Sequence, residues 1–149
     1  MNERYEGNDP DFPVRLASAF FLEAKQRAAK ALYRYNIEKT GVDDRAPVGA
    51  EITDPAGNVL GGLWGRTELG LLFLDMFFIP EQLRGQWHGA RLLAAVEGEA
   101  RRRGCKRAVV ETSSFQAPDF YLRHGYEEFG RVPFGLSGHA RVFLRKELA

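Results

Sequence analysis

Residues 75–93 read DMFFIPEQLRGQWHGARLL, and they begin inside an apolar run that extends from Gly70 to Ile79. A nearly continuous apolar run of this length is typical of a central strand that is covered on both faces. Pro80 ends the strand because it cannot donate to a ladder, and the glycines that follow it indicate a loop. Apolar residues spaced three and four apart then predict an amphipathic helix that ends at Gly104, namely Leu92, Leu93, Val96 and Ala100.

The loop between this strand and this helix suits the binding of phosphate. Glycines that lead into a helix present unpaired backbone N–H groups and the positive end of the helix dipole, and Arg84 adds a positive charge. A plain turn role for Gly85 and Gly89 is the alternative. The pattern Arg84-x-x-Trp87-x-Gly89-Ala90 resembles the acyl-CoA-binding motif of the GNAT acetyltransferases, Gln/Arg-x-x-Gly-x-Gly/Ala. Trp87 stands where the family usually has glycine, so either the backbone still donates with the indole turned outward, or the phosphates sit differently.

A second motif follows about thirty residues later, where residues 113–126 read SSFQAPDFYLRHGY. Ser114 is a candidate helix N-cap, Pro118 fits the first turn, and Gly125 can end the helix in a left-handed conformation. The spacing is similar to the GNAT element Asn-x-x-Ala-x-x-Leu-Tyr-x-x-x-Gly-Phe, with Ser114 in the asparagine position and matches at Ala117, Phe120, Tyr121, Gly125 and Tyr126. On these two motifs in this order, the chain is identified as a member of the GNAT superfamily over about residues 51–148.

Periodicity and turn residues predict the remaining elements. They are a short strand at 3–6, a helix at 14–39, a hairpin of strands 48–53 and 59–66 around the turn 54–58, a strand at 107–112, a helix at 114–124, and strands at 126–132 and 141–148. This order predicts a mixed α/β fold with a sheet of about six to seven strands and helices on both faces. The resemblance implies that the sheet is splayed at its centre. The length of 149 residues predicts one domain, residues 1–149.

Composition excludes several classes of protein. A chain that is 44% hydrophobic and 28% charged is globular, and its formal net charge of +1 gives no electrostatic case for a nucleic-acid partner. Cys105 is the single cysteine and is expected to be buried at the start of a strand, so the chain suits a reducing compartment and no metal site is expected. Because the start is polar, no signal peptide is expected there, and no apolar run is long enough to span a bilayer. A cytoplasmic protein without a membrane partner is therefore expected, and a homodimer is compatible with the sequence.

The resemblance implies that acetyl-CoA binds as co-substrate where two central parallel strands separate. Its pantetheine would hydrogen-bond to the backbone of Phe77, Phe78 and Ile79, whose side chains can still pack in the core. Ser114 and Phe120 of the second motif would complete the cofactor site. The pyrophosphate would lie on the loop residues Arg84, Gly85, Gln86, Trp87, His88, Gly89 and Ala90. Surface exposure is the alternative for His88.

The same resemblance places the hydroxyl of Tyr121 near the cofactor sulfur, where the departing thiolate needs a proton, and so predicts a general acid. Packing between helix and sheet is the alternative role for this ring. The reaction also needs a base, because an alkyl amine with a pKa near 10.4 is neutral in only about one molecule in 2500 at pH 7. Asp75 is the one ionisable residue of the apolar strand and, by alternation, would share a face with Phe73, Phe77 and Ile79. Glu111 is the competing base, and a structural salt bridge is the alternative for either carboxylate.

Histidine is the usual proton carrier near neutral pH, but the histidines are not the first choice here. His124 lies at a predicted helix C-terminus, where the helix dipole favours a positively charged side chain. His139 follows a loop that resembles an acceptor-side loop of the family, so His139 and Arg141 are candidates for contact with the acceptor. The helix at 14–39 would form another part of the acceptor pocket.

These observations predict an acyl-CoA-dependent N-acyltransferase that moves an acetyl group from acetyl-CoA to a primary amine by direct attack. The acceptor is a small molecule or a protein lysine. A catalytically idle acyl-CoA-binding or sensing module on the same fold is the alternative from another class, because Trp87 and Ser114 depart from the family pattern and fold does not fix function.

Overall fold

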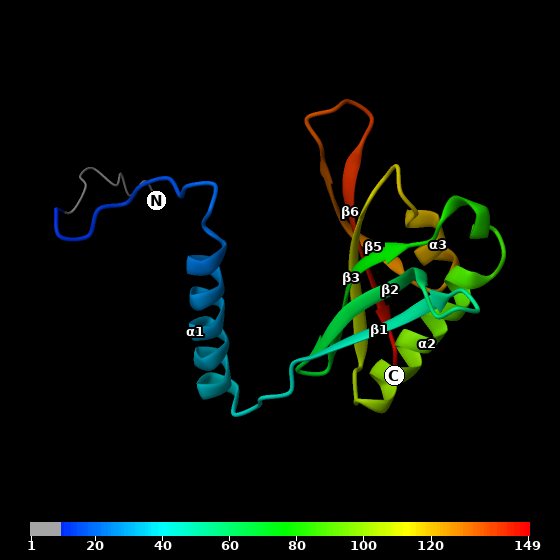
Figure 1. The fold of residues 1–149 in the computed structure, drawn as a ribbon, viewed down its shortest axis with the longest axis horizontal. Helices are drawn as coiled ribbons and strands as arrows, with labels where there is room; N and C mark the ends of the chain where they lie inside the picture. Colours follow the sequence, from blue (N-terminus) through cyan, green and yellow to red (C-terminus); the bar gives the residue numbers. More distant parts are fainter. Residues whose placement is uncertain (1–9) are drawn as a thin grey trace. The chain divides into compact units, whose positions relative to one another are not determined.

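The computed structural model describes residues 10–149, which divide into two compact units. The first unit ends at Asp43 and contains the helix α1 (Leu22–Thr40), and the second runs from Asp44 to Ala149 and contains the sheet (Figure 1). The strand expected at residues 3–6 lies outside the described residues. A single domain over residues 1–149 therefore stays a prediction.

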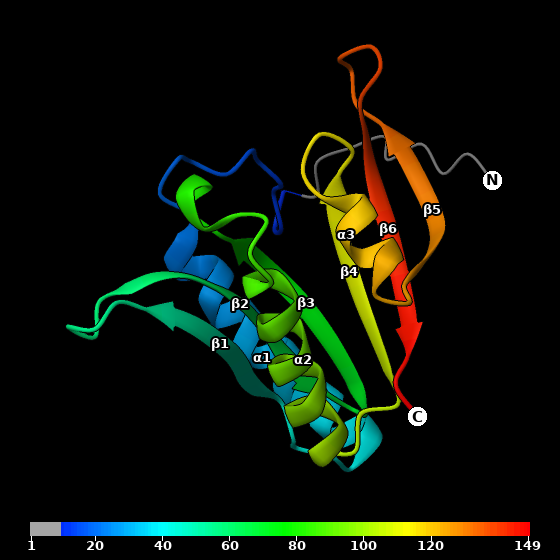
Figure 2. The same cartoon turned by 90° about the vertical axis from the view of Figure 1, so that its right-hand side faces the viewer.

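The second unit is built on a six-stranded sheet with the order β1-β2-β3-β4-β6-β5. Its strands are β1 (Ala46–Thr53), β2 (Val59–Glu68), β3 (Leu71–Phe78), β4 (Arg107–Ser113), β5 (Glu127–Pro133) and β6 (Ala140–Glu147). The helix α2 (His88–Arg102) packs against β1, β2 and β3, while α3 (Pro118–Arg123) packs against β5, and Figure 2 shows both on one face of the sheet. The predicted mixed α/β fold is confirmed. Helices on both faces would involve α1, which belongs to the other unit, so that part stays a prediction.

The centre of the sheet is splayed, as expected. β3 and β4 run parallel and pair from Leu71 with Arg107 to Leu74 with Val110, after which the strands separate (Figure 2). Both strands continue beyond that point, β3 to Phe78 and β4 to Ser113. The carboxyl-terminal halves of β3 and β4 therefore do not pair with each other, and the backbone groups on their facing edges are left for a bound molecule.

A β-bulge at Asp75 marks the start of the splay. The pairing register of β2 with β3 shifts just before Gly65, where a Cβ would clash with the carbonyl oxygen of Phe73. The extra residue reverses the alternation of side chains. Phe77 therefore packs against the core, whereas Asp75 and Phe73 both contact Arg66 on the opposite face. The prediction that Asp75 shares a face with Phe77 and Ile79 is wrong, because both pack against the core and strict alternation assumes a strand without a bulge.

One hydrophobic core lies between the helices and the sheet, and its largest fully buried side chains are Leu63, Leu72, Leu93, Leu144, Val96 and Val142. Cys105 is buried at the edge of this core, as the sequence predicts. A polar group is also enclosed: Glu97 of α2 accepts hydrogen bonds from the hydroxyl of Tyr126 at 2.7 Å and from Nζ of Lys146 at 2.9 Å. Within residues 10–149, no helix combines the length and the apolar character needed to cross a membrane.

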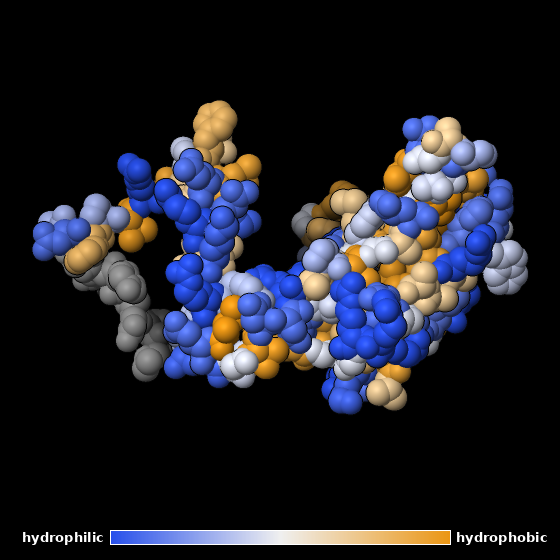
Figure 3. All heavy atoms as spheres, turned by 60° about the horizontal axis from the view of Figure 1, so that its bottom comes forward, coloured by the Kyte–Doolittle hydropathy of each residue, from blue (hydrophilic) through white to orange (hydrophobic). Residues whose placement is uncertain are grey.

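The first unit contains the predicted helix, although with a later start. α1 begins at Leu22 instead of Val14, and its N-cap residue Phe21 offers no side-chain cap, so no capping signal marks the true start. The helix ends at Gly41, as expected, with a left-handed φ of 72°. In Figure 3, hydrophilic side chains cover most of the visible face of this unit, with apolar side chains between them.

Candidate active site

A cavity of about 800 Å³ lies where β3 and β4 separate. Its lining comes from the carboxyl-terminal half of β3, the loop that leads into α2, the end of β4 and the first turns of α3. Thr112 and Tyr121 line it from the face that the helices cover, while Asp75, Glu111 and Arg141 line it from the other face. The splay therefore brings both sequence motifs to one cavity that is reached from both faces of the sheet.

The strand residues expected to hold pantetheine all line this cavity, namely Phe77, Phe78 and Ile79. Phe77 and Ile79 pack against the core, and the ring of Phe77 stacks on that of Phe120 at a centroid distance of 5.0 Å. Phe78 is half exposed. The carbonyl oxygen of Ile79 accepts a hydrogen bond from Nε of Arg84 at 2.8 Å, so Arg84 ties the loop to the end of the strand.

The predicted phosphate loop also lies on the cavity. A short 3-10 helix (Glu81–Leu83) precedes it, and α2 begins at His88. All seven loop residues expected to bind the cofactor line the cavity: Arg84, Gly85, Gln86, Trp87, His88, Gly89 and Ala90. Within the described chain, no hydrogen bond uses the backbone N–H of Gly85, Gln86 or Trp87, and the first N–H groups of α2 have no partner inside the helix. The loop therefore offers a row of donors at a helix N-terminus.

The backbone at Trp87 has a conformation that glycine adopts more readily than other residues. Its φ of 67° lies in the left-handed region, which disfavours residues with a Cβ. Trp87 is 81% exposed, so its indole is turned outward. This agrees with the outward indole of the first arrangement, while donation by the backbone to the phosphates stays a prediction.

Replacing Trp87 with glycine should relieve this strain. We expect Trp87→Gly to raise the free energy of unfolding by about 1 kcal/mol, because glycine adopts positive φ freely and is also preferred to tryptophan at an N-cap. Trp87→Ala is the matched control, since it removes the indole but keeps the Cβ and should bring no such gain. Urea unfolding of the three proteins measures the difference. Equal stability of the glycine and alanine variants would refute the strain.

Gly89 has a different role, because it allows α2 to pack closely against two aromatic rings. A Cβ there would lie 3.0 Å from the ring of Phe120 and 3.2 Å from the ring of Phe77. The absence of a side chain thus lets the first turn of α2 lie against the two aromatic rings at the floor of the cavity.

Tyr121 lies in the cavity with its ring buried and its hydroxyl free. The residue is 3% exposed, and its ring contacts those of Phe77, Phe120 and Tyr126. Within residues 10–149 this hydroxyl has no hydrogen-bond partner. Every fully buried side-chain oxygen in that range does have one, so the hydroxyl is not fully buried and reaches the cavity. Burial raises the pKa of Tyr121 to about 12. The group is therefore protonated and can donate.

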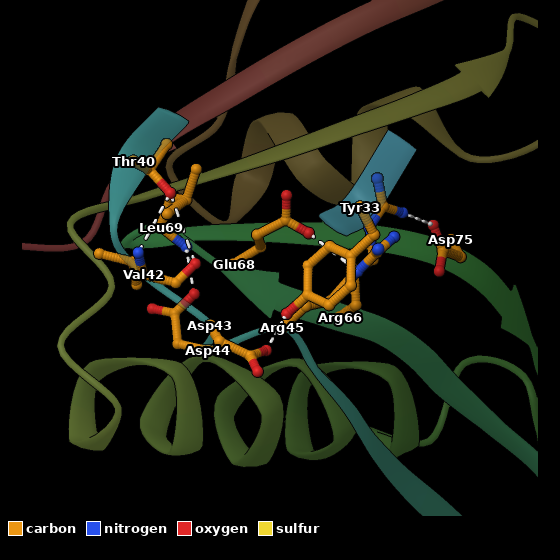
Figure 4. A network of polar contacts seen from close by, with 10 residues as sticks. All are labelled: Tyr33, Thr40, Val42, Asp43, Asp44, Arg45, Arg66, Glu68, Leu69 and Asp75. Atoms are coloured by element: carbon orange, nitrogen blue, oxygen red, sulfur yellow. Dashed lines mark hydrogen bonds and ion pairs between the residues drawn. The ribbon is translucent and has the colours of Figure 1, made fainter. Parts of the chain in front are cut away.

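The two candidate bases both line the cavity, and both are paired with arginine. Oδ1 of Asp75 accepts a hydrogen bond from Nη1 of Arg66 at 3.2 Å. Figure 4 marks this interaction with a dashed line. Glu111 accepts from Nε of Arg141 at 2.9 Å, and both carboxylates line the cavity. The Asp75 and Glu111 side chains are 54% and 53% exposed. Ion pairs that are this exposed add little to the free energy of unfolding. A structural salt bridge, which was the alternative role for either carboxylate, would therefore stabilise the fold only weakly.

The second motif differs from its prediction at its start. The helix predicted over 114–124 spans only Pro118–Arg123, and Ser114 is not its N-cap, because the hydroxyl of Ser114 accepts the backbone N–H of Ala140 at 2.9 Å. Ser114 does not line the cavity. Gly125 follows the helix with a φ of 90°, as expected. His124 lines the cavity beside Phe120, with ring centroids 4.6 Å apart.

Sequence analysis missed Gln116, which lines the cavity and closes the turn after β4. Its Oε1 accepts hydrogen bonds from the backbone N–H of Ser113 at 2.9 Å and from the hydroxyl of Thr112 at 3.2 Å. The same turn brings Phe115 to the cavity. The motif pattern leaves both positions undefined, so no sequence signal distinguished them.

Comparison with known proteins agrees with this geometry. Residues 9–126 match the family model described as the acetyltransferase (GNAT) family. The chain is 35% identical over 124 residues to an acetyltransferase of Agrobacterium fabrum, which covers 83% of this chain and 90% of that protein. It is 39% identical over 93 residues to blasticidin-S acetyltransferase of Streptomyces morookaense, covering 62% and 68% of the two chains. The crystal structure of a proposed acetyltransferase from Agrobacterium tumefaciens has a TM-score of 0.80 at 34% identity, covering 90% of this chain and 96% of that one.

Proposed function

This chain belongs to the acetyltransferase (GNAT) family, and we propose that it transfers an acetyl group from acetyl-CoA to the primary amine of a small molecule. The observation that carries the proposal is the cavity at the central splay, which holds the free hydroxyl of Tyr121 together with the carboxylates of Asp75 and Glu111. A proton donor and a proton acceptor are the two groups that direct aminolysis of a thioester requires.

The residues around the cavity fit acetyl-CoA as co-substrate. Beyond Leu74 the edge of β3 that faces β4 is unpaired, so the backbone of Phe77 and Phe78 can hydrogen-bond to the amide groups of pantetheine. The loop before α2 offers N–H donors and the dipole of a 15-residue helix to the pyrophosphate. Arg84 uses Nε on Ile79 and keeps its other nitrogens for phosphate. Ser114 is left out of this proposal, because its hydroxyl already accepts from Ala140.

The proposed reaction is a direct attack. The amine nitrogen forms a bond to the carbonyl carbon of the thioester while the bond from carbon to sulfur breaks. Asp75, directly or through water, takes a proton from the bound ammonium so that the neutral amine can attack, and Glu111 is the competing base. Tyr121 donates its proton to the departing thiolate, and the second proton that the nitrogen loses as the amide forms returns to the tyrosinate through solvent. Holding the amine beside the thioester supplies much of the rate, so no covalent enzyme intermediate is required.

A small-molecule acceptor is favoured by one of the relatives. The Streptomyces protein is named for the acetylation of blasticidin S, and 39% of the aligned residues are identical. The names of the relatives do not support the idle acyl-CoA-binding module as the alternative. Acetylation of protein lysines remains an outcome that the following experiment can return.

The test is thiol release from acetyl-CoA with a panel of amines that includes blasticidin S, aryl amines, alkyl amines and a lysine peptide. We expect turnover with at least one small amine. Acetyl-CoA alone should also stabilise the folded state, by about 2.7 kcal/mol at a hundred times its dissociation constant. Arg84→Ala should reduce that stabilisation, whereas Arg84→Lys should keep more of it because it keeps the charge. Stabilisation without any thiol release would favour the binding module. The absence of both stabilisation and thiol release would overturn the proposal.

A further inference from the structure

An exposed group of aromatic rings adjoins the cavity through Phe115, which is one of the lining residues. Phe115, Phe134 and His139, here called the aromatic cluster, come from the turn after β4 and from the loop between β5 and β6. The ring centroids of Phe115 and Phe134 are 6.0 Å apart, and His139 meets Phe115 edge-on at 5.2 Å. Phe115 is 60% exposed and Phe134 is 40% exposed. The cluster therefore shows apolar ring surface to solvent.

The cluster is held in place by the backbone of its loop. The N–H of Phe134 donates to the carbonyl oxygen of His139 at 2.9 Å, and the N–H of His139 donates to that of Leu136 at 3.3 Å. Ser114 precedes Phe115, and Ala140 follows His139. The hydroxyl of Ser114 accepts from the backbone N–H of Ala140, and the N–H of Ser114 donates to the carbonyl oxygen of Ala140. The turn and the loop are thus tied together, and the rings form one fixed surface.

The cluster is continuous with the proposed site of amine attack. Phe115 lines the same cavity as Asp75, Glu111 and Arg141. Nη1 of Arg141 also donates to the hydroxyl of Ser113 at 2.9 Å, so this side chain of β6 is held by Ser113 and Glu111 of β4. An ammonium group is attracted to the carboxylates of Asp75 and Glu111, while an adjoining apolar group can cover Phe115. Charge and apolar surface are therefore arranged for one molecule that carries both.

We propose that the acceptor carries a flat aromatic ring close to its amine, with the ring packed on Phe115 of the aromatic cluster while the ammonium group faces Asp75 and Glu111. This inference rests on the proposed function. A ring suits the site better than a flexible alkyl chain, because aromatic rings gain from stacked and edge-to-face contacts beyond the apolar area that they bury. A ring also loses less conformational entropy on binding than a chain of the same size.

The test compares kcat/KM for phenethylamine, tyramine and tryptamine with that for butylamine, cadaverine and cyclohexylethylamine. The last of these has the skeleton of phenethylamine without aromaticity. We expect the best aryl acceptor to exceed the best alkyl acceptor by roughly tenfold or more. Phe115→Ala should lower kcat/KM for the aryl acceptor by roughly tenfold to a hundredfold and for butylamine by less than about threefold.

Phe129→Ala is the matched control, because Phe129 is an exposed phenylalanine of β5 that does not line the cavity. Phe134→Ala provides a second variant of the cluster if Phe115→Ala is poorly folded, and the melting temperature of each variant shows whether it is. Alkyl acceptors that react as fast as aryl acceptors overturn the inference, as does an equal loss for both classes in Phe115→Ala. A wild-type protein that neither binds acetyl-CoA nor acetylates any amine overturns the proposed function instead.

Discussion

Tyr121→Phe is expected to lower kcat by roughly a hundredfold to ten-thousandfold, which is the usual contribution of a general acid. The affinity for acetyl-CoA should change by no more than about fivefold, because at most one ordinary hydrogen bond is lost. The phenylalanine keeps the ring that contacts Phe77, Phe120 and Tyr126, so the packing of α3 should be unaffected. Turnover is measured by thiol release at saturating acetyl-CoA, and affinity by the thermal shift.

The position of the hydroxyl is the reason to expect a loss in the rate. Within the described residues it has no hydrogen-bond partner and reaches the cavity, so its proton is available to the thiolate. Because burial raises the pKa of Tyr121 to about 12, the group stays protonated through neutral and mildly alkaline pH. Deprotonation of Tyr121 should therefore cause no fall in activity below about pH 11.

Tyr126→Phe is the matched control for this experiment. Tyr126 is also buried, and its ring lies 5.4 Å from that of Tyr121, but its hydroxyl donates to Glu97 instead of reaching the cavity. We expect the control to lose stability and to keep turnover within a few-fold of the wild type. A few-fold loss of turnover in Tyr121→Phe would assign protonation of the sulfur to water or to another donor.

The sequence predicted the elements whose signals are local. Pro80, Gly104 and Gly125 mark ends of the central strand and of two helices, and each prediction agrees with the structure to within one or two residues. The parallel pairing at the centre was implied by the family resemblance, and β3 and β4 do pair in parallel. The element ends depend on neighbouring residues, which can be read from one sequence.

The features that the sequence did not predict depend on residues far apart in the chain. Asp75 changes face because Gly65, on another strand, permits a bulge. Ser114 resembles an N-cap by local spacing, yet its hydroxyl accepts from Ala140 of β6. Periodicity places Glu97 beside the apolar stripe of α2, but it cannot show that Tyr126 and Lys146 reach its carboxylate. Such partners are decided by the packing of separate elements.

The enclosed carboxylate of Glu97 leads to the second large effect, which is on stability. Its side chain is 6% exposed, and that of its ion-pair partner Lys146 is 19% exposed. Glu97 joins α2 to β6 and to Tyr126 just before β5. Burial, together with the hydrogen bond to Glu97, raises the pKa of Tyr126. Removing the carboxylate would leave a largely buried ammonium and a buried hydroxyl without their partner, and both are costly.

We therefore expect Glu97→Ala to lower the free energy of unfolding by about 3–5 kcal/mol, as is typical when one partner of a buried ion pair is removed. Glu97→Gln should cost less, because the amide still accepts a hydrogen bond from Tyr126. Glu99→Ala on the same helix is the matched control: Glu99 pairs with Arg102 and Arg103 nearer the surface, so its removal should cost about 1 kcal/mol or less. Urea unfolding at equal m-values measures all three. A loss of the same size in Glu97→Ala and Glu99→Ala would show that the enclosed ion pair contributes no more than a surface pair.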